Sequence, residues 1–305
     1  MKVAVTGIAG FIGSWLARDL VLNGHDVVGM DLVATQHYEQ GDLLTPGLVE
    51  DWFDQERPDV CYHLAAQIGR LHGEDDPMYS VRENAGMTAY VARACGERGI
   101  RLAYTSSSEI YGDQGDRLIT EEDEYGAVPH NIYGLTKRHG EEISRMYAPD
   151  GLVIVRPNMP YGPGVPPGRG RRALDTFLWW AHTGQPIIVH RGSARCWTWV
   201  GDLVAGMRLA IESPAAATYN VGNGEDDILP MLCLAERACD LAGAPRDLIT
   251  VVDPPVVDPE TGVRWRQTPV KRISSQRLVD LGWVPRVTLD DGLPEVYRWI
   301  VEWSS

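Results

Sequence analysis

The sequence lacks several features that would mark other classes of protein. Its five cysteines include no Cys-x-x-Cys pair, and no group of histidines and cysteines has the spacing of zinc ligands. No uncharged apolar run reaches the roughly 18 residues that a membrane-spanning helix needs. The sequence therefore predicts no metal site and no membrane partner.

Basic charge is also scarce. The formal net charge is −14, and only three of the 305 residues are lysine: Lys2, Lys137 and Lys271. A protein that binds a nucleic-acid duplex needs a dense basic face. None is evident, so we expect no nucleic-acid partner. The arginine cluster "GRGRR" at 168–172 suits one phosphate or carboxylate group, or else is a solvated loop.

The first residues and the cysteines both indicate the cytoplasm. The stretch "MKVAVTGIAGFIG" reaches a glycine-punctuated turn at Gly7 before any long apolar segment, which is not typical of a secretory signal peptide. The cysteine count is odd, and Cys61 and Cys95 lie in apolar, core-like runs. We therefore expect reduced thiols in a cytoplasmic protein.

The first half of the chain alternates between short β-rich runs and segments with helical periodicity. The β-rich runs are "KVAVT", "DVVGMD", "HYEQGD", "VCYHLAA", "IRLAYTSSS" and "GLVIVRP". This alternation predicts an α/β fold: a doubly wound parallel sheet of the Rossmann type, with helices on both faces. Proline and glycine become denser after Arg156, which indicates a smaller C-terminal lobe that closes over a cleft.

A glycine-rich turn separates the first strand from the first helix. In "TGIAGFIG", Gly7, Gly10 and Gly13 lie three residues apart. Glycines at these points let the chain turn, let backbone N–H groups approach a phosphate, and let the helix pack on the sheet. A glycine triplet alone is weak evidence, but its place between a strand and a helix predicts a dinucleotide site.

An acidic residue supports the same interpretation. Asp31 ends the second strand, 18 residues after Gly13. A carboxylate there can accept hydrogen bonds from both hydroxyls of the adenosine ribose and would repel a 2′-phosphate, which favours NAD over NADP. The alternative is a strand-terminal aspartate that begins a turn. Asp42 and Leu43 follow the third strand and could meet the adenine.

Several motifs in a fixed order resemble one family. They are the glycine turn, Asp31, "HLAA" at 63–66, "TSSSEIYG" at 105–112, "YGLTK" at 133–137, "RPNMPYGPG" at 156–164, "ARCWTWVGDLVAG" at 194–206, "YNVGNG" at 219–224 and "LGWVPRVTLDDGL" at 281–293. This set is similar to the extended short-chain dehydrogenase/reductase family, in its group of NAD-dependent nucleotide-sugar epimerases, dehydratases and decarboxylases.

The resemblance implies a cofactor, a domain division and an oligomeric state. It implies an NAD-binding domain at residues 1–156 with about 195–222, and a substrate-binding lobe at about 157–194 and 223–305. It also implies a homodimer that pairs through helices at about 80–98 and 131–148. The NAD-contacting residues that it adds are Phe11, Ile12, Leu64, Ala65 and Ala66, together with Tyr133 and Lys137.

Tyr133 and Lys137 lie four residues apart and hence on one face of a helix. A nearby ammonium favours phenolate and should lower the pKa of the phenol. With three lysines in the chain, a chance Tyr-x-x-x-Lys is roughly a one-in-ten event. The family's catalytic Ser or Thr corresponds to Ser107, four residues before Tyr111.

The resemblance implies a cycle of transient oxidation. Tyr133 takes the proton of a sugar hydroxyl, expected at C4, and Ser107 hydrogen-bonds the same oxygen. The hydride passes to NAD⁺ and later returns, so no net redox change occurs. The ketone acidifies the neighbouring C–H, which a weak carboxylate base can then deprotonate.

Glu109 favours dehydratase-like chemistry within this group. It falls where related dehydratases and decarboxylases carry a glutamate and where simple 4-epimerases carry Ser or Thr. A 4-epimerase and a UDP-glucuronate decarboxylase remain alternatives, as does a solvent-facing Glu109 on an exit turn. A net NADH-dependent keto-sugar reductase or a dinucleotide sensor without catalysis would be different functions on the same fold.

The substrate side departs from the family pattern. Met159 stands at the position of the family's substrate-contacting Asn, and Asn158 comes one residue early. Arg195 corresponds to a diphosphate-binding arginine, because a planar fork suits phosphate oxygens, and Lys271 with Arg272 falls near another phosphate contact. The substrate-binding residues we predict are Ser108, Asn158, Arg169, Arg195 and Arg272, and the expected substrate is a nucleoside-diphosphate sugar.

Overall fold

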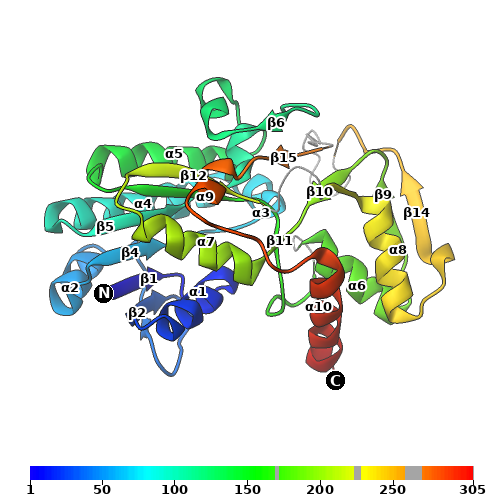
Figure 1. Cartoon of the computed structure of the whole chain (residues 1–305), viewed down its shortest axis with the longest axis horizontal. Coiled ribbons are helices and arrows are strands. Elements are labelled where there is room, and N and C mark those ends of the chain that lie inside the picture. Colours follow the sequence, from blue (N-terminus) through cyan, green and yellow to red (C-terminus); the bar gives the residue numbers. More distant parts are fainter. Residues whose placement is uncertain (169–171, 223–227, 258–269, 305) are drawn as a thin grey trace.

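A computed structural model describes residues 1–168, 172–222, 228–257 and 270–304 (Figure 1). Its larger part is a parallel sheet between two layers of helices, and its smaller part is a helical lobe that contains the C-terminal helix. Arg169, which we predicted to bind substrate, lies outside the described residues.

The central sheet contains seven parallel strands in the order β12-β7-β5-β4-β1-β2-β3. Their bounds are Lys2–Thr6 (β1), Asp26–Asp31 (β2), Glu39–Gln40 (β3), Val60–His63 (β4), Arg101–Thr105 (β5), Val153–Pro157 (β7) and Ala217–Val221 (β12). The chain order reverses between β1 and β4, so the carboxyl ends of these two strands border the crevice where such sheets bind ligands.

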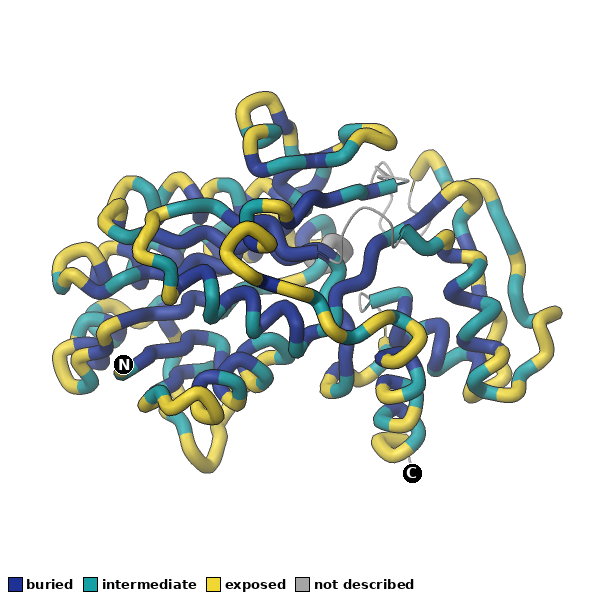
Figure 2. Tube along the Cα trace, viewed as in Figure 1, coloured by how far each residue is buried: buried dark blue, intermediate teal, exposed yellow. Residues whose placement is uncertain are grey.

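Helices cover both faces of this sheet. One face carries α1 (Phe11–Leu22), α7 (Val200–Glu212) and α9 (Gln276–Asp280), whose apolar side chains pack with those of β1, β4 and β7. The other face carries α2 (Leu48–Glu56), α4 (Pro77–Arg98) and α5 (Ile132–Tyr147). Both cores consist of apolar side chains that are almost fully buried. The dark blue segments of Figure 2 mark the buried residues along the chain.

Local sequence explains where the two long helices begin and end. The Asp76 side chain accepts a hydrogen bond from the Tyr79 N–H (2.9 Å), and Pro77 occupies the first position of α4. Gly99 ends α4 in the left-handed conformation, at φ 65°. The Asn131 side chain caps α5 by accepting from the Gly134 N–H at 2.7 Å.

The smaller lobe has a core of its own. Its helices are α6 (Ala173–Thr183), α8 (Met231–Ala242) and α10 (Leu289–Ser304), which bury Leu, Phe and Trp side chains against one another. Short two-stranded sheets join β14 (Ile249–Val252) to β9 (Ile187–His190), β10 (Ala194–Cys196) to β13 (Ile228–Pro230), and β11 (Thr198–Trp199) to β8 (Pro160–Tyr161).

Shorter elements complete the described chain. They are α3 (Arg70–Asp75), the 3-10 helices η1 (Ser108–Tyr111), η2 (Glu121–Gly126) and η3 (Arg246–Leu248), and the paired strands β15 (Arg272–Ile273) and β6 (Leu118–Ile119). No helix among the described residues is both long and apolar enough to cross a membrane.

The predicted fold class, a Rossmann-type parallel sheet with a smaller lobe, is confirmed. The third strand is shorter than the sequence suggested, because only Glu39 and Gln40 pair with β2. The seventh strand, β12, was not predicted as a strand although its segment was assigned to the larger domain. The division of the chain into an NAD-binding domain and a substrate lobe stays a prediction.

A buried ionic network joins the sheet to α5. Arg156 on β7 is fully buried, and its guanidinium donates to both carboxylate oxygens of Glu141, Nε at 2.8 Å and Nη2 at 2.6 Å. Its Nη1 donates to the Tyr111 hydroxyl at 2.7 Å, and Glu124 also contacts it. Glu141 accepts a further bond from the Ser106 Oγ at 2.5 Å.

We expect Arg156→Met to lower the free energy of unfolding by about 3–5 kcal/mol, because it leaves the buried Glu141 carboxylate without its closest cation and with only the longer contact to Arg145 (3.5 Å). Urea unfolding followed by circular dichroism measures this loss. Arg246→Met is the control, since the Arg246–Asp240 pair (2.8 Å) is exposed and should cost about 1 kcal/mol or less. Equal losses in the two variants would contradict the prediction.

Candidate active site

The glycine turn after β1 has the shape that a pyrophosphate requires. A β-carbon on Gly7 would lie 2.7 Å from the Ala65 nitrogen, and one on Gly13 would lie 2.2 Å from the Gly7 oxygen. Only glycine fits at both positions. Gly10 precedes α1 and has no side chain that could cap the helix, so the N–H groups of the first turn remain available for an anion. The turn therefore fits a dinucleotide.

Asp31 stands beside this turn at the end of β2. Its Oδ2 accepts from the Ala9 N–H at 2.9 Å, and its Oδ1 accepts from the Val33 N–H at 3.1 Å. A carboxylate has about four acceptor positions, so it can hold the backbone and still accept from ribose hydroxyls. The predicted ribose contact and the turn-forming alternative are thus both compatible with the geometry.

We expect Asp31→Ala to weaken NAD binding by about 10- to 100-fold, the effect of losing hydrogen bonds to a charged group. Isothermal titration calorimetry with NAD measures this affinity. Asp26→Ala is the control, because Asp26 lies exposed at the other end of the same strand. Unchanged affinity in Asp31→Ala would remove the ribose assignment.

The other predicted cofactor residues lie around the same crevice. Leu64, Ala65 and Ala66 follow β4, and the Ala65 N–H donates to the Thr6 Oγ1 at 3.3 Å. Leu43 is buried in the core beside α2, whereas Asp42 is exposed and its Oδ1 accepts from the Leu44 N–H at 2.9 Å. None of these placements tests a contact with NAD, so their roles stay predictions.

Phe11 and Ile12 begin α1 and are half-buried. The Phe11 ring lies under the Arg172 guanidinium, with 4.2 Å from Cζ to the ring centroid. Arg172 in turn donates to Asp175 (Nη2 to Oδ1, 2.9 Å) and to the Pro160 carbonyl oxygen at 2.8 Å. Phe11 therefore links the glycine turn to the start of α6, a contact that the sequence did not predict.

The catalytic residues that the sequence predicted come together at the end of β5. Lys137 is buried on α5, and its Nζ donates to the Thr105 carbonyl oxygen at 2.8 Å. Ser107 follows Thr105 by two residues and precedes η1, and it hydrogen-bonds Tyr133, one helical turn before Lys137. The structure thus brings Ser107 and Lys137 to the carboxyl end of β5, with Tyr133 one turn before Lys137 on α5, and their catalytic roles stay predictions.

The acidity of Tyr133 differs from our expectation. Burial and the Glu109 charge raise the pKa of Tyr133 to about 12, and only the Ser107 hydrogen bond acts to lower it. Burial also lowers the pKa of Lys137 to about 7, against the opposing charge of Glu141. The expectation that Lys137 makes the phenol acidic was wrong for this structure, because desolvation disfavours the charged forms of both groups.

Glu109 is held by two partners, and 33% of its side chain is exposed, so it is neither free on an exit turn nor fully buried. Its Oε1 accepts from the Lys271 Nζ at 2.6 Å, and its Oε2 accepts from the Asn131 Nδ2 at 2.8 Å. Burial acts to raise the pKa of Glu109, but the charges of Lys271 and Arg195 and these two hydrogen bonds lower it to about 2. Glu109 is therefore a carboxylate at neutral pH.

Lys271 and Asn131 both contact Glu109, and neither contact was predicted from the sequence. Lys271 was expected beside a phosphate, but it is buried and also donates to the Ser108 carbonyl oxygen at 3.3 Å. One signal was present: in a chain with three lysines, Lys271 lies in the weakly polar run "TPVKRI". Its partner is 162 positions away, so no local pattern could reveal the pair.

Asn158 and Met159 occupy the segment in which the family carries one substrate-contacting Asn. The Asn158 Oδ1 accepts from the Ser108 Oγ at 3.0 Å, and its buried Nδ2 has no partner among the described residues. Met159 has the left-handed φ of 43°, which Asn tolerates better than Met, and its side chain packs in the core of the smaller lobe. Asn158 is therefore a buried amide with an unused donor among the described residues, and its contact with a substrate stays a prediction.

The two predicted arginines come from neighbouring short strands. Arg195 lies on β10 and Arg272 begins β15. The Arg195 Nη1 donates to the Ala194 carbonyl oxygen at 2.8 Å, and its charge acts on Glu109. The Arg272 Nε is buried without a partner among the described residues. Arg195 therefore lies in the region of Glu109, where an anionic ligand could use its charge, and the substrate role of Arg272 stays a prediction.

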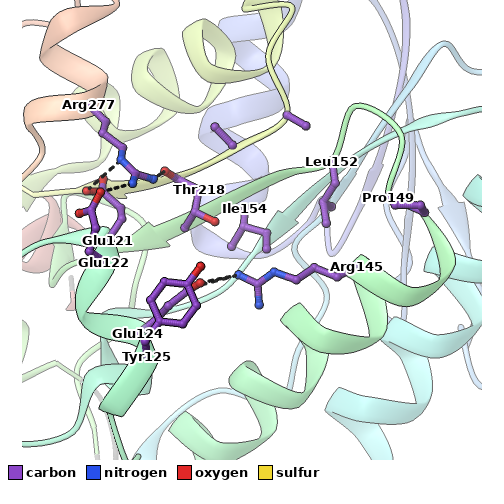
Figure 3. Close-up of a pocket in the computed structure, with 12 residues that line it drawn as sticks. Glu121, Glu122, Glu124, Tyr125, Arg145, Pro149, Leu152, Ile154, Thr218 and Arg277 are labelled. Carbon is purple, nitrogen blue, oxygen red and sulfur yellow. Dashed lines mark hydrogen bonds and ion pairs between the residues drawn. The ribbon is translucent and has the colours of Figure 1, made fainter.

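A separate pocket of about 400 Å³ lies away from these residues (Figure 3). It opens at the amino ends of β7 and β12 and is lined by Glu121, Glu122, Glu124, Tyr125, Arg145, Pro149, Leu152, Ile154, Ala216, Ala217, Thr218 and Arg277. Arg145 contacts Glu124, and Arg277 contacts Glu122, so its charged groups already pair with each other. We assign it no role.

The fold and this site define a dinucleotide-dependent enzyme of the short-chain dehydrogenase/reductase type. Residues 3–222 match the model of the "NAD dependent epimerase/dehydratase family", and the chain belongs to that family. Its recognition from sequence motifs is confirmed, and so is NAD as its cofactor.

Similar proteins act on nucleotide sugars. The chain is 26% identical over 324 residues to UDP-glucuronic acid decarboxylase 2 of Arabidopsis thaliana, covering 96% of this chain and 67% of that protein. It is 26% identical over 349 residues to UDP-glucuronate 4-epimerase 1 of the same plant, covering 99% and 77%. The structure of UDP-glucose 4-epimerase from Thermus thermophilus, in complex with NAD, matches with a TM-score of 0.85, 25% identity and 99% coverage of both chains.

Proposed function

We propose that this NAD-dependent enzyme eliminates water from a nucleoside-diphosphate sugar after transient oxidation at C4. One observation supports this choice above others: Asn131, two residues before Tyr133, holds the ionised Glu109 carboxylate at 2.8 Å, and the Glu109 charge acts to raise the pKa of the Tyr133 phenol. A carboxylate there hinders the deprotonation of Tyr133. Its presence is best explained if Glu109 handles a second proton later in the reaction.

The chain's own residues perform the proton transfers. Bound NAD supplies a hydride acceptor for the sugar carbon and later the hydride that restores it. Tyr133 takes the proton of the C4 hydroxyl, and Ser107, which hydrogen-bonds Tyr133, holds the same oxygen. Lys137, anchored on the Thr105 carbonyl oxygen, would hold the ribose of the nicotinamide.

Glu109 acts on the carbon next to the ketone. Once C4 is oxidised, the C5 hydrogen becomes acidic, because the carbonyl stabilises the carbanion as an enolate. Glu109 is the carboxylate whose charge acts on Tyr133, and we assign it as the base that removes the C5 proton. The Asn131 Nδ2 donates to the Glu109 Oε2 at 2.8 Å, which orients the carboxylate. One carboxylate oxygen therefore contacts a neutral amide, and the other contacts the Lys271 cation.

The diphosphate and sugar would bind between the two parts of the molecule. We propose that Arg195 and Arg272 bind phosphate oxygens and that Ser108 and Asn158 contact the sugar. The buried Nδ2 of Asn158 and the buried Nε of Arg272 support these roles, since each is a donor without a partner among the described residues.

A second candidate is decarboxylation or epimerisation of a nucleotide-linked uronic acid. Both relatives named above are enzymes of UDP-glucuronate. Two cations, Lys271 and Arg195, act on the single carboxylate of Glu109, so a further carboxylate on the sugar could be accommodated there. The enzyme is then a lyase or an isomerase, and elimination is the chemistry we favour.

Mass spectrometry separates these chemistries. Purified enzyme would be incubated with UDP-glucose, dTDP-glucose, GDP-mannose and UDP-glucuronate. We expect one of them to lose water. Loss of carbon dioxide from UDP-glucuronate would replace elimination with decarboxylation, and an unchanged mass with altered chromatographic mobility would replace it with epimerisation.

We also propose a homodimer that pairs through α4 and α5. These helices lie side by side on one face of the sheet (Figure 1), and they expose apolar side chains: Met78, Tyr79, Leu135, Met146 and Tyr147. Light scattering should give twice the chain mass, and Met146→Asp should give a monomer.

We also propose the domain division at residue 156 and a cytoplasmic location. The five cysteines, all of them thiols, support the cytoplasmic location.

A further inference from the structure

Lys271 has a position that the roles above leave unexplained. It is buried, with an exposed side-chain fraction of 3%, and it precedes β15, far in sequence from the catalytic residues. Its Nζ nevertheless lies 2.6 Å from the Glu109 Oε1 and 3.3 Å from the Ser108 carbonyl oxygen. Burying an ammonium costs free energy unless it is paired. The contact with Glu109 therefore compensates for the burial of Lys271.

The Glu109–Lys271 pair joins a base to a group that can release a proton. An ammonium has three N–H donors, and two of those on Lys271 have partners among the described residues. Asn131, the other partner of Glu109, has no titratable proton. Of the described side chains that hydrogen-bond the Glu109 carboxylate, only Lys271 carries a proton that it can give to a substrate oxygen.

Elimination of water needs such a donor. Hydroxide is a strong base and leaves slowly unless it is protonated as the C–O bond breaks. The neighbouring position holds Ser108, whose hydroxyl is a poor acid and already donates to the Asn158 Oδ1 at 3.0 Å. A general acid must come from elsewhere in the site, and Lys271 is the cation in direct contact with the base.

We propose that Lys271 is the general acid of the elimination, paired with Glu109 as its base; this rests on the function proposed above. The C5–H bond breaks and its proton passes to Glu109, while a double bond forms between C5 and C6. The C6–O bond breaks, and the departing oxygen takes a proton from Lys271 and leaves as water. Glu109 then returns its proton across the 2.6 Å contact to the neutral Lys271 amine. The C4 carbon takes back its hydride and the C4 oxygen takes back the proton from Tyr133, so the product has lost water, keeps the C5–C6 double bond and shows no net oxidation.

This scheme also resolves the weakness of Glu109 as a base. The Lys271 charge and hydrogen bond are the main influences that hold the pKa of Glu109 down. When Lys271 gives up its proton, these influences disappear, and Glu109 becomes more basic at the same moment. The two transfers therefore assist each other, and both residues end in their starting protonation states.

The decisive variant is Lys271→Arg. A guanidinium keeps the positive charge and can still pair with Glu109, but it does not release its proton at ordinary pH. The probes are UDP-glucose, dTDP-glucose and GDP-mannose, each with its 6-deoxy-6-fluoro analogue. Fluoride is a weak base and leaves without protonation. The comparison uses the nucleotide sugar from which the wild-type enzyme eliminates water, together with the 6-deoxy-6-fluoro analogue of that sugar.

We expect Lys271→Arg to lower the rate of water loss by about 100-fold or more, the lower end of what a general acid contributes. Fluoride release from the analogue, measured with an ion-selective electrode, should stay within about 5-fold of wild type. Lys271→Gln, checked for its fold by thermal melting, should show the same contrast. Glu109→Gln should lose both activities, because both eliminations need the base.

Two results would overturn the proposal. If Lys271→Arg and Lys271→Gln lose both activities in equal measure, Lys271 only positions Glu109. If both variants eliminate water at the wild-type rate, Lys271 donates no proton. A wild-type enzyme that eliminates neither water nor fluoride from any probe would instead refute the proposed elimination itself, and the acid role of Lys271 would fall with it.

Discussion

Tyr133→Phe should lower turnover by about 10²- to 10⁴-fold, the usual contribution of a general acid–base group, while NAD remains bound. The substitution removes one oxygen and leaves the ring, so the packing of α5 against η1 should persist. The phenol oxygen is the group that takes the C4 hydroxyl proton, and Ser107 cannot replace it, because an ordinary alcohol is a far weaker acid and forms essentially no alkoxide at neutral pH. Product formation by mass spectrometry and NAD binding by calorimetry measure the two halves of the expectation.

Tyr125→Phe is the matched control. Tyr125 is 85% exposed on η2 and lines the pocket away from the catalytic residues, so this variant should have wild-type activity. Near-normal turnover in Tyr133→Phe would show that Tyr133 is not the base. Loss of NAD binding together with turnover would show instead that Tyr133 mainly holds the cofactor.

Glu109→Gln should stop product formation but still allow the first half of the cycle. In a single turnover with excess enzyme we expect partial build-up of the reduced nicotinamide absorbance, because the sugar is oxidised at C4 and cannot proceed. The amide should retain the hydrogen-bonding capacity toward Asn131 while losing the charge that Lys271 and Arg195 now stabilise. Removing that charge also removes one of the causes that raise the pKa of Tyr133, so the oxidation step should not slow.

Glu122→Gln is a suitable control, because Glu122 is an exposed partner of Arg277 in the separate pocket. If Glu109→Gln makes product at the wild-type rate, the proposed elimination is wrong and epimerisation becomes the favoured reaction. If it neither makes product nor accumulates the reduced nicotinamide, Glu109 is required for the oxidation itself, which would contradict its role as a second base.

Much of the fold follows from patterns that are local in sequence. Parallel strands buried on both faces give continuous apolar runs such as "KVAVT" and "GLVIVRP", and helices between them are bounded by recognisable signals such as Asp76 and Gly99. The glycine turn could be predicted because Gly7 and Gly13 have no room for a β-carbon. Tyr133 and Lys137 could be paired because one helix fixes their spacing.

The remainder depends on contacts between distant segments. β12 is a short strand whose assignment needs its neighbour β7, which lies more than sixty residues earlier. Lys271 reaches Glu109 only because β15 pairs with β6, across a long chain separation. The pKa of Tyr133 was mispredicted for the same reason: the sequence contains the lysine four residues away, but not the burial and the Glu109 charge that outweigh it.

The fate of the C4 hydrogen tests the central claim most directly. A nucleotide sugar that carries deuterium at C4 would be converted by the wild-type enzyme, and the product would be analysed by mass spectrometry and NMR while the nicotinamide absorbance is recorded. The borrowed-hydride cycle predicts a product that has lost water, retains the deuterium within the same molecule, and forms without net accumulation of reduced nicotinamide. Deuterium lost from the product together with stoichiometric reduced cofactor would mean a net oxidoreductase and would contradict the account.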